Sequence, residues 1–152
     1  MHVIYNLVLS LWIGGITMFT FIITPVIFKS FSRDMAGMIV GKLFPGYFWF
    51  NLILSIVALM LLLFAGLSFA KSGYKISLIL IVLSVIINVY VTFKLHPDVR
   101  EVKKEIHSFE EKAVDSSLRT RFGRLHAISA SLNLLLLANG VTLLIISTTL
   151  RK

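Results

Sequence analysis

Four apolar runs of about 20 residues or more dominate this chain of 152 residues. A run of this length can cross the hydrocarbon layer of a bilayer as an α-helix, because the helix rises about 1.5 Å per residue. Hydrophobic residues make up 57% of the chain, against roughly 45 to 50% in a soluble globular domain. The sequence therefore predicts an all-α integral membrane protein, and the four runs predict a four-helix bundle.

The predicted spans cover most of the chain and leave one segment that cannot cross a membrane. The spans are expected at residues 3–28, 46–70, 74–95 and 126–150. Between the third and fourth spans, residues 98–114 place Val99, Val102 and Ile106 on one helical face and charges on the rest. We expect an amphipathic helix there, lying on the membrane interface or folded against the bundle mouth. The whole chain, residues 1–152, is expected to form a single membrane domain.

The distribution of basic residues predicts the orientation in the membrane. A short loop with Lys29, Arg33, Asp34 and Lys42 is expected after the first span. This loop and the segment between the third and fourth spans hold eleven of the 15 lysines and arginines. By the positive-inside rule these two segments face the cytoplasm, and both termini lie outside a plasma or inner membrane.

The formal net charge of +8 also bears on the partners of the protein. The basic residues lie at segment ends and in loops and form no patch interleaved with aromatic residues, so we expect no nucleic acid partner. Their placement predicts contact with the lipid bilayer and its anionic headgroups. A homo-oligomer of the bundle is compatible with the same pattern.

Several kinds of chemistry lack the residues they need. The chain has no cysteine, which excludes disulfides, thiolate metal sites and thiol catalysis. It has no G-x-S-x-G motif, no H-E-x-x-H motif and no glycine-rich phosphate loop. No carboxylate or lysine lies deep within a predicted span, where an ion-coupled transporter would carry its charged switch. These absences favour a non-enzymatic protein.

A polar constellation marks the start of the fourth span. His126, Ser129 and Asn133 follow an i, i+3, i+7 pattern and therefore share one helical face. A neutral imidazole near the membrane boundary can ligate haem or a metal, or relay a proton, with Ser129 and Asn133 as supporting partners. Alternatively, His126 fixes the fourth helix to a neighbour through a hydrogen bond. The sequence leaves both interpretations open.

A second histidine lies at the same predicted depth, because His96 ends the third span where His126 begins the fourth. Two imidazoles at one end of a bundle are able to bind a single iron or copper ion, or a haem. The alternative is that His96 caps the amphipathic helix that follows it.

Polar side chains recur at helical spacing inside the other spans. Tyr47 and Asn51 share a face of the second span, and Asn88 lies on a polar stripe of the third. With Asn133 they are candidates for a shared binding site or for a narrow path that passes a small solute. More often such residues form interhelical hydrogen bonds, each contributing roughly 0.6 to 2 kcal/mol in lipid.

Three stretches carry a family resemblance: GKLFPGYFWFN at 41–51, NVYVTFKLHPDVREVK at 88–103, and RFGRLHAISASLNLLLLANG at 121–140. Together they resemble the membrane family of eukaryotic transmembrane protein 205, whose bacterial relatives share a domain of unknown function. The resemblance covers most of the chain and implies a compact four-helix membrane domain. It also implies that the family pattern is carried by Lys42, Phe44, Pro45, Tyr47, Pro97, His126, Ser129 and Asn133. Ala127 stands where the family usually has glycine.

The first span more loosely resembles two other membrane families, through Trp12, the Gly14–Gly15 pair and Pro25. These are the copper-resistance D proteins and the haem-dependent protoporphyrinogen oxidases of four-helix type. Members usually place a histidine one or two turns before the tryptophan, where this chain has Tyr5 and Asn6. We therefore do not assign the histidine ligand of these families to any residue of this chain.

Three functional hypotheses follow. The first is a non-enzymatic protein that binds or passes a small molecule or metal through a polar site around His126. Its further binding residues are Ser129, Asn133, Asn51, Tyr47, Asn88 and Lys42. The second is a haem- or quinone-linked redox protein with His126, joined by His96, as ligand. The third is a structural or partner-binding scaffold that uses the apolar seam of residues 99–109.

Overall fold

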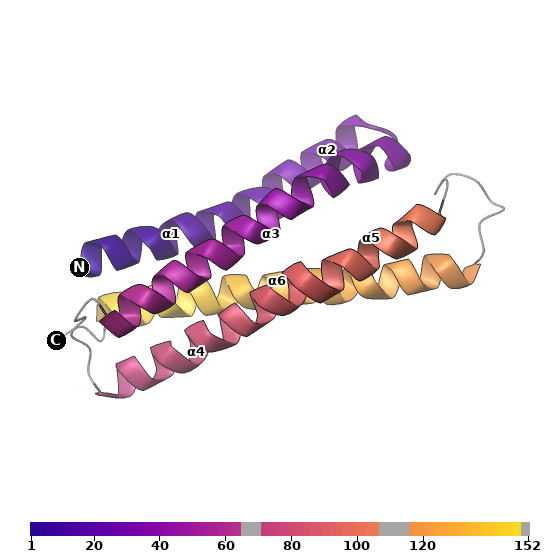
Figure 1. Cartoon of the computed structure of the whole chain (residues 1–152). Coiled ribbons are helices and arrows are strands. Elements are labelled where there is room, and N and C mark those ends of the chain that lie inside the picture. The colour runs from indigo at the N-terminus through magenta and orange to yellow at the C-terminus, as the bar shows by residue number, and fades with distance from the viewer. Residues whose placement is uncertain (65–70, 107–115, 150–152) are drawn as a thin grey trace.

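A computed structural model of the chain describes residues 1–64, 71–106 and 116–149 (Figure 1). These residues form helices that run side by side as long rods. Four helical stretches among them are long and apolar enough to cross a bilayer: His2–Ser30, Arg33–Phe64, Gly73–Glu105 and Ser116–Thr149. The predicted all-α, four-helix membrane fold is therefore confirmed, and the protein is an integral membrane protein.

Each rod is built from one or more consecutive helical elements. The first rod consists of α1 (His2–Met18), the π-helical segment η1 (Phe19–Ile23) and α2 (Thr24–Ser30). The second is α3 (Arg33–Phe64). The third consists of α4 (Lys71–Tyr90), the π-helical segment η2 (Val91–Leu95) and α5 (His96–Glu105), and the fourth is α6 (Ser116–Thr149).

The predicted charged loop after the first span is wrong, because Lys29 lies in α2 and only Phe31 and Ser32 separate α2 from α3. The backbone is extended at Phe31, and α3 then begins at Arg33 and continues through Pro45. Ala36 and Val40, four residues apart, are buried on its inner face. Burial of this face stabilises a helix in a stretch whose charges and proline had indicated a loop.

The amphipathic helix exists but differs from the predicted segment 98–114. It begins at His96 as a continuation of the third rod and ends at Glu105, where Ile106 has an extended backbone. Val102 is fully buried and Ile106 nearly so, in agreement with the predicted apolar face. Residues 107–115 lie outside the described residues. Of the two expected placements, the structure has the helix folded against the bundle, because α5 packs on α6.

Both π-helical segments end two residues before a proline, Pro25 in the first rod and Pro97 in the third. A proline inside a helix lacks its N–H donor, and its ring clashes with the carbonyl four residues earlier. A π-helical turn is wider than an α-helical turn and can accommodate this defect. Each rod therefore continues past its proline instead of ending there.

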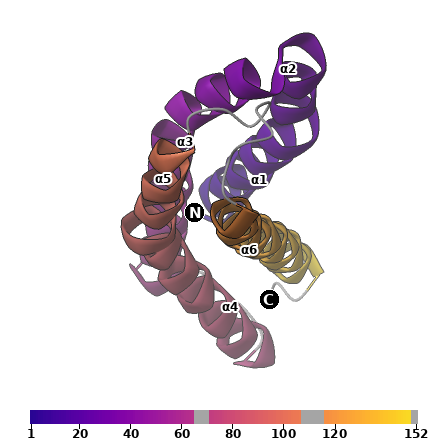
Figure 2. The ribbon, with the colours of Figure 1, turned by 90° about the vertical axis from the view of Figure 1, so that its right-hand side faces the viewer.

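The rods pack as a ring rather than as a flat layer (Figure 2). α1 packs against α3 and α6, and α4 packs against the same two helices. Trp12, fully buried on α1, lies against Gly140 of α6, where an added Cβ would come within 3.0 Å of Ile13. The absence of a side chain at Gly140 therefore lets α1 and α6 approach closely.

The two ends of the bundle differ. Met1 and Thr149 lie at one end, together with the C-terminal part of α3 and the N-terminal part of α4 (Figure 1). The other end contains α2, α5 and the first turns of α3 and α6. There α2 packs on α3 and α5 packs on α6, so the mouth of the bundle is formed by two helix pairs.

Candidate functional site

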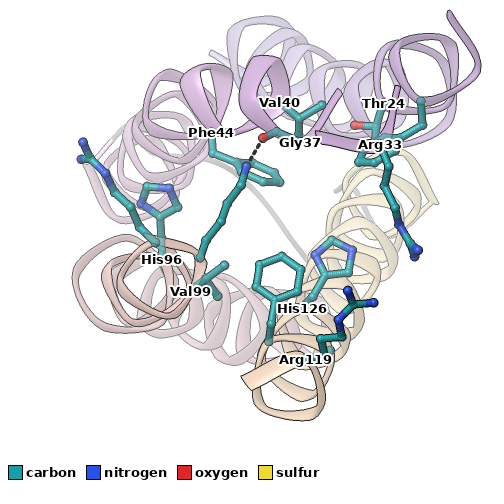
Figure 3. Close-up of a pocket in the computed structure, with 15 residues that line it drawn as sticks. Thr24, Arg33, Gly37, Val40, Phe44, His96, Val99, Arg119 and His126 are labelled. Atoms are coloured by element: carbon teal, nitrogen blue, oxygen red, sulfur yellow. Dashed lines mark hydrogen bonds between the residues drawn. The ribbon is translucent and has the colours of Figure 1, made fainter. Parts of the chain in front are cut away.

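A pocket of about 550 Å³ opens at the mouth of the bundle, between these two helix pairs (Figure 3). This volume lies within the usual range for small-molecule sites. Its lining comes from α2, α3, α5 and α6: Thr24, Phe28, Arg33, Gly37, Val40, Gly41, Phe44, His96, Val99, Arg100, Lys103, Arg119, Phe122, Gly123 and His126.

Both predicted histidines line this pocket, on different helices and on opposite sides (Figure 3). His126 is exposed at the mouth, and its ring stacks on Phe122 with the centroids 6.0 Å apart. His96 is half-buried and packs edge-on against Phe48, with the centroids 5.1 Å apart. The sequence placed the two imidazoles at one depth, and the structure brings them to one cavity.

Four cationic side chains share the lining with the histidines. Arg33 comes from α3, Arg100 and Lys103 from α5, and Arg119 from α6. Figure 3 shows Arg33 and Arg119 on the same side of the pocket as His126. Within the described part of the chain, no carboxylate contributes to this lining. The pocket is therefore electropositive, which favours an anionic ligand.

Lys103 crosses the pocket and is held on α3. Its ammonium donates a hydrogen bond to the carbonyl oxygen of Gly37. A Cβ added at Gly37 or at Gly41 would come within 3.3 Å of the Lys103 Nζ atom. The Asp34 carboxylate, which does not line the pocket, attracts the same ammonium. Because Gly37 and Gly41 have no side chains, the Lys103 side chain can pack directly against the backbone of α3.

An apolar wall completes the pocket. Val40, Phe44, Val99 and Phe122 contribute aliphatic and aromatic surface. Phe44 stacks on Phe48 just below it on α3, with the ring centroids 5.3 Å apart. A cavity with a cationic rim and an apolar wall suits a ligand that is itself part charged and part apolar.

A cluster of hydrogen-bonded side chains, here called the polar node, lies across the bundle axis beneath the pocket. It consists of Tyr47, Asn133 and Thr20. The Tyr47 hydroxyl donates to Asn133 Oδ1 at 2.5 Å, and Asn133 Nδ2 donates to Thr20 Oγ1 at 2.7 Å. This node joins α3, α6 and η1. The Tyr47 ring also stacks on Phe19, with the centroids 4.1 Å apart.

The node lies one to two helical turns deeper than the pocket. Thr20 precedes Thr24 by four residues on the first rod, and Asn133 follows His126 by seven residues on α6. Because both pairs keep helical spacing, each polar node residue lies below a lining residue on the same face. Ser129, half-buried, lies between His126 and Asn133 on α6.

Further polar contacts connect the helices below the node. Asn139 Nδ2 donates to Ser84 Oγ at 3.1 Å, linking α6 to α4. Near the opposite end, the Ser147 hydroxyl donates to Asn6 Oδ1 at 2.6 Å, linking α6 to α1. These carboxamides thus form interhelical hydrogen bonds, the more common of the two interpretations of the polar stripes.

The remaining predicted binding residues are distributed over several places. Asn51 is buried on α3, and its Nδ2 donates to the Tyr47 carbonyl oxygen at 2.9 Å. Asn88 is buried on α4, and its Nδ2 has no hydrogen-bond partner among the described residues. Neither belongs to the pocket lining. Lys42 is exposed on α3 and also lies outside the lining.

The arrangement of donors does not favour a metal ion. Among the residues that the structure describes, no three histidines or carboxylates lie close enough together to hold one. Metal sites in proteins usually combine three or more such ligands. The four cationic side chains of the lining would also repel a metal cation.

The cations of the pocket were not predicted as site residues, because Arg33, Arg100, Lys103 and Arg119 served only to count charge for the topology. One local signal was available for part of the site. Gly37 and Gly41 form a G-x-x-x-G pattern, which indicates that another part of the chain approaches the helix closely. Nothing in the spacing says that the approaching group is Lys103.

Comparisons with known proteins match most of the chain. The model of a family described as a domain of unknown function, DUF4149, matches residues 7–108. An uncharacterised protein of Aquifex aeolicus (strain VF5) is 31% identical over 140 residues, which cover 91% of each chain. No solved structure matches. A match to a domain of unknown function with a bacterial relative agrees with part of the predicted resemblance, and kinship with transmembrane protein 205 stays a prediction.

Proposed function

Because the chain belongs to the family of the domain of unknown function DUF4149, we propose its function from the site: it is an integral membrane protein that binds a small organic molecule in the pocket around His126. The observation that carries this proposal is the pocket itself, a cavity of about 550 Å³ that four helices line and that both histidines border. Kinship with eukaryotic transmembrane protein 205 is part of the same proposal, on the motifs at 41–51 and 121–140.

Binding is favoured over passage through the bundle. The node of Tyr47, Asn133 and Thr20 crosses the axis directly beneath the pocket. The next residues on the inner face of α1 are Ile16 and Trp12, which are fully buried. A ligand in the pocket therefore meets a packed interior, and its exit leads back to the membrane surface.

Two glycines supply a matched pair of variants for testing this function. A Cβ added at Gly123 or at Gly46 would meet no atom within 4 Å, so both positions have room for a larger side chain. Gly123 lines the pocket, whereas Gly46 does not. Gly123→Trp should fill the cavity, and Gly46→Trp should leave it open.

We expect the protein purified in mild detergent to retain a small molecule, detected by native mass spectrometry as added mass. The wild type and Gly46→Trp should carry this mass, and Gly123→Trp should lose it, because the indole would occupy the ligand's space. Retention of the same mass by Gly123→Trp would refute binding in this pocket. A wild type with no added mass, from the native membrane as well as from an expression host, would favour the scaffold hypothesis.

A redox function is the second candidate, since an imidazole lines the pocket beside Arg33 and Arg119. Histidine is a common axial ligand of haem iron, and arginines can pair with carboxylate groups such as haem propionates. If the retained molecule is haem, the purified protein should show a Soret absorption band that His126→Ala abolishes. A colourless protein that retains another mass would exclude haem as the ligand, and the retained mass would show whether the ligand is a quinone.

The pocket end of the bundle is proposed to face the cytoplasm, with both termini outside, because most basic residues lie at that end. The chain has no cysteine, so a single introduced cysteine is a unique reporter of sidedness. In intact cells we expect Ser32→Cys, between α2 and α3, to resist a membrane-impermeant maleimide, and His2→Cys to react. The reverse labelling pattern would place the pocket on the outer side.

A further inference from the structure

The pocket lies at the depth where lipid headgroups lie. Its lining on α3 runs from Arg33 to Phe44, and on α6 from Arg119 to His126. On both helices the uncharged, strongly apolar stretch begins just beyond these residues. A bilayer whose hydrocarbon layer matches those stretches has its headgroup layer at the level of the pocket.

The charges of the lining match a phosphate group better than they match a neutral or cationic headgroup. Three of the four cations are arginines, and two of them, Arg33 of α3 and Arg119 of α6, lie on the same side of the pocket. The guanidinium group presents paired N–H donors that fit phosphate oxygens in a bidentate manner. Lys103 adds a positive charge, although its ammonium also donates to the Gly37 carbonyl.

The uncharged part of the lining accounts for the rest of the ligand. Val40, Phe44, Val99 and Phe122 provide an apolar wall next to the cations. The polar node and the stacked Phe19 and Tyr47 rings block the axis below. An apolar chain attached to the phosphate therefore cannot continue along the bundle axis and has to lie along the apolar wall of the pocket.

We propose that the pocket binds a phosphate-headed membrane lipid, with the phosphate held by Arg33 and Arg119 and the acyl chain directed into the bilayer. This inference rests on the proposed function and names its ligand class. A free phosphate would offer the same charge without the apolar chain, so the two sources can be separated by experiment.

The test uses a single cysteine as a reporter in the cysteine-free chain. Thr24 lines the pocket and is half-buried, so Thr24→Cys places a thiol of similar size at its wall. The rate of its modification by a maleimide is measured in detergent, with three added probes. They are oleoyl lysophosphatidic acid, monooleoylglycerol with the same chain but no phosphate, and inorganic phosphate.

We expect lysophosphatidic acid to slow the modification about ten-fold or more at saturation, as a bound ligand should shield the thiol. The other two probes should leave the rate unchanged at the same concentration. Equal protection by monooleoylglycerol would overturn the phosphate assignment, and equal protection by inorganic phosphate would overturn the lipid assignment. In either case, the native mass spectrometry of Gly123→Trp still tests binding in the pocket independently. No protection by any probe would overturn the inference, while the retained mass decides the proposed function separately.

A charge-matched pair of variants tests the residues. Arg33→Gln with Arg119→Gln, in the reporter background, removes two cations of the lining. Arg121→Gln with Arg124→Gln removes two exposed cations of α6 that do not line the pocket. We expect the first pair to require about 100-fold more lysophosphatidic acid for half-protection, at about ten-fold per lost arginine contact. The second pair should match the reporter protein.

If the two pairs of substitutions weaken protection equally, the lipid is attracted by general surface charge, and the proposed phosphate site is wrong. Arg33→Gln alone is a milder variant in case the double substitution impairs folding. Arg33 is exposed on α3, so its replacement should leave the fold intact. We expect this variant to weaken protection about ten-fold, and an unchanged protection curve would contradict the assigned phosphate contact.

Discussion

Trp12→Ala is expected to destabilise the bundle more than any other single substitution considered for this protein. Trp12 is fully buried on α1 and lies against Gly140 of α6, at a close contact between two helices. Removal of a buried tryptophan side chain costs about 3 to 5 kcal/mol in protein cores, because it loses packing and leaves a cavity. We expect a large fall in the midpoint of thermal unfolding in detergent, followed by circular dichroism, and a low yield of folded protein.

The other tryptophan of the chain is a matched control for this experiment. Trp49 is 48% exposed, and its ring meets Phe93 edge-on with the centroids 5.6 Å apart. Trp49→Ala should therefore cost about 1 kcal/mol, the scale of one aromatic contact. Trp12→Phe keeps most of the buried volume and should fall between the two. Equal unfolding midpoints for Trp12→Ala and Trp49→Ala would contradict the burial of Trp12 between α1 and α6.

The fold was predictable because an apolar segment inside a bilayer has few conformations that satisfy its backbone hydrogen bonds. Runs such as 126–150 are long enough to span the bilayer and must satisfy their own backbone hydrogen bonds, so they form helices. The first turns of α3 were missed for a different reason. Arg33 and Pro45 indicate a loop locally, but Ala36 and Val40 are buried against neighbouring segments, and this tertiary contact outweighs the local signal.

The candidate site was only partly predictable, since spacing along one helix does not determine which helices meet. The pattern of His126 and Asn133 placed both residues on one face of α6, as the structure has them. It could not show that Asn133 meets Tyr47 and Thr20 while His126 lines a separate pocket. The arginines of the pocket were harder to predict than the histidines. Arg33 and Arg119 are far apart in sequence and line one cavity only because of how the two helix pairs are arranged.

Asn133→Leu is expected to produce the second largest loss of stability, and to act on the floor of the pocket. Leucine is similar in size but can neither accept from the Tyr47 hydroxyl nor donate to Thr20 Oγ1. Two interhelical hydrogen bonds are lost, each contributing roughly 0.6 to 2 kcal/mol in a membrane protein, so the total cost should be about 1 to 4 kcal/mol. The midpoint of thermal unfolding in detergent measures this cost.

A double-mutant cycle distinguishes the node from a general effect of the leucine. Tyr47→Phe removes one of the same two bonds, so combining it with Asn133→Leu should cost less than the sum of the single costs. Additive costs would show that Tyr47 and Asn133 do not interact. Leu135→Ala, at an exposed and lipid-facing position two residues along α6, should leave the midpoint nearly unchanged. If the node forms the floor of the pocket, Asn133→Leu should also alter protection at Thr24→Cys, because the aromatic stack of Phe19 and Tyr47 loses its anchor to α6.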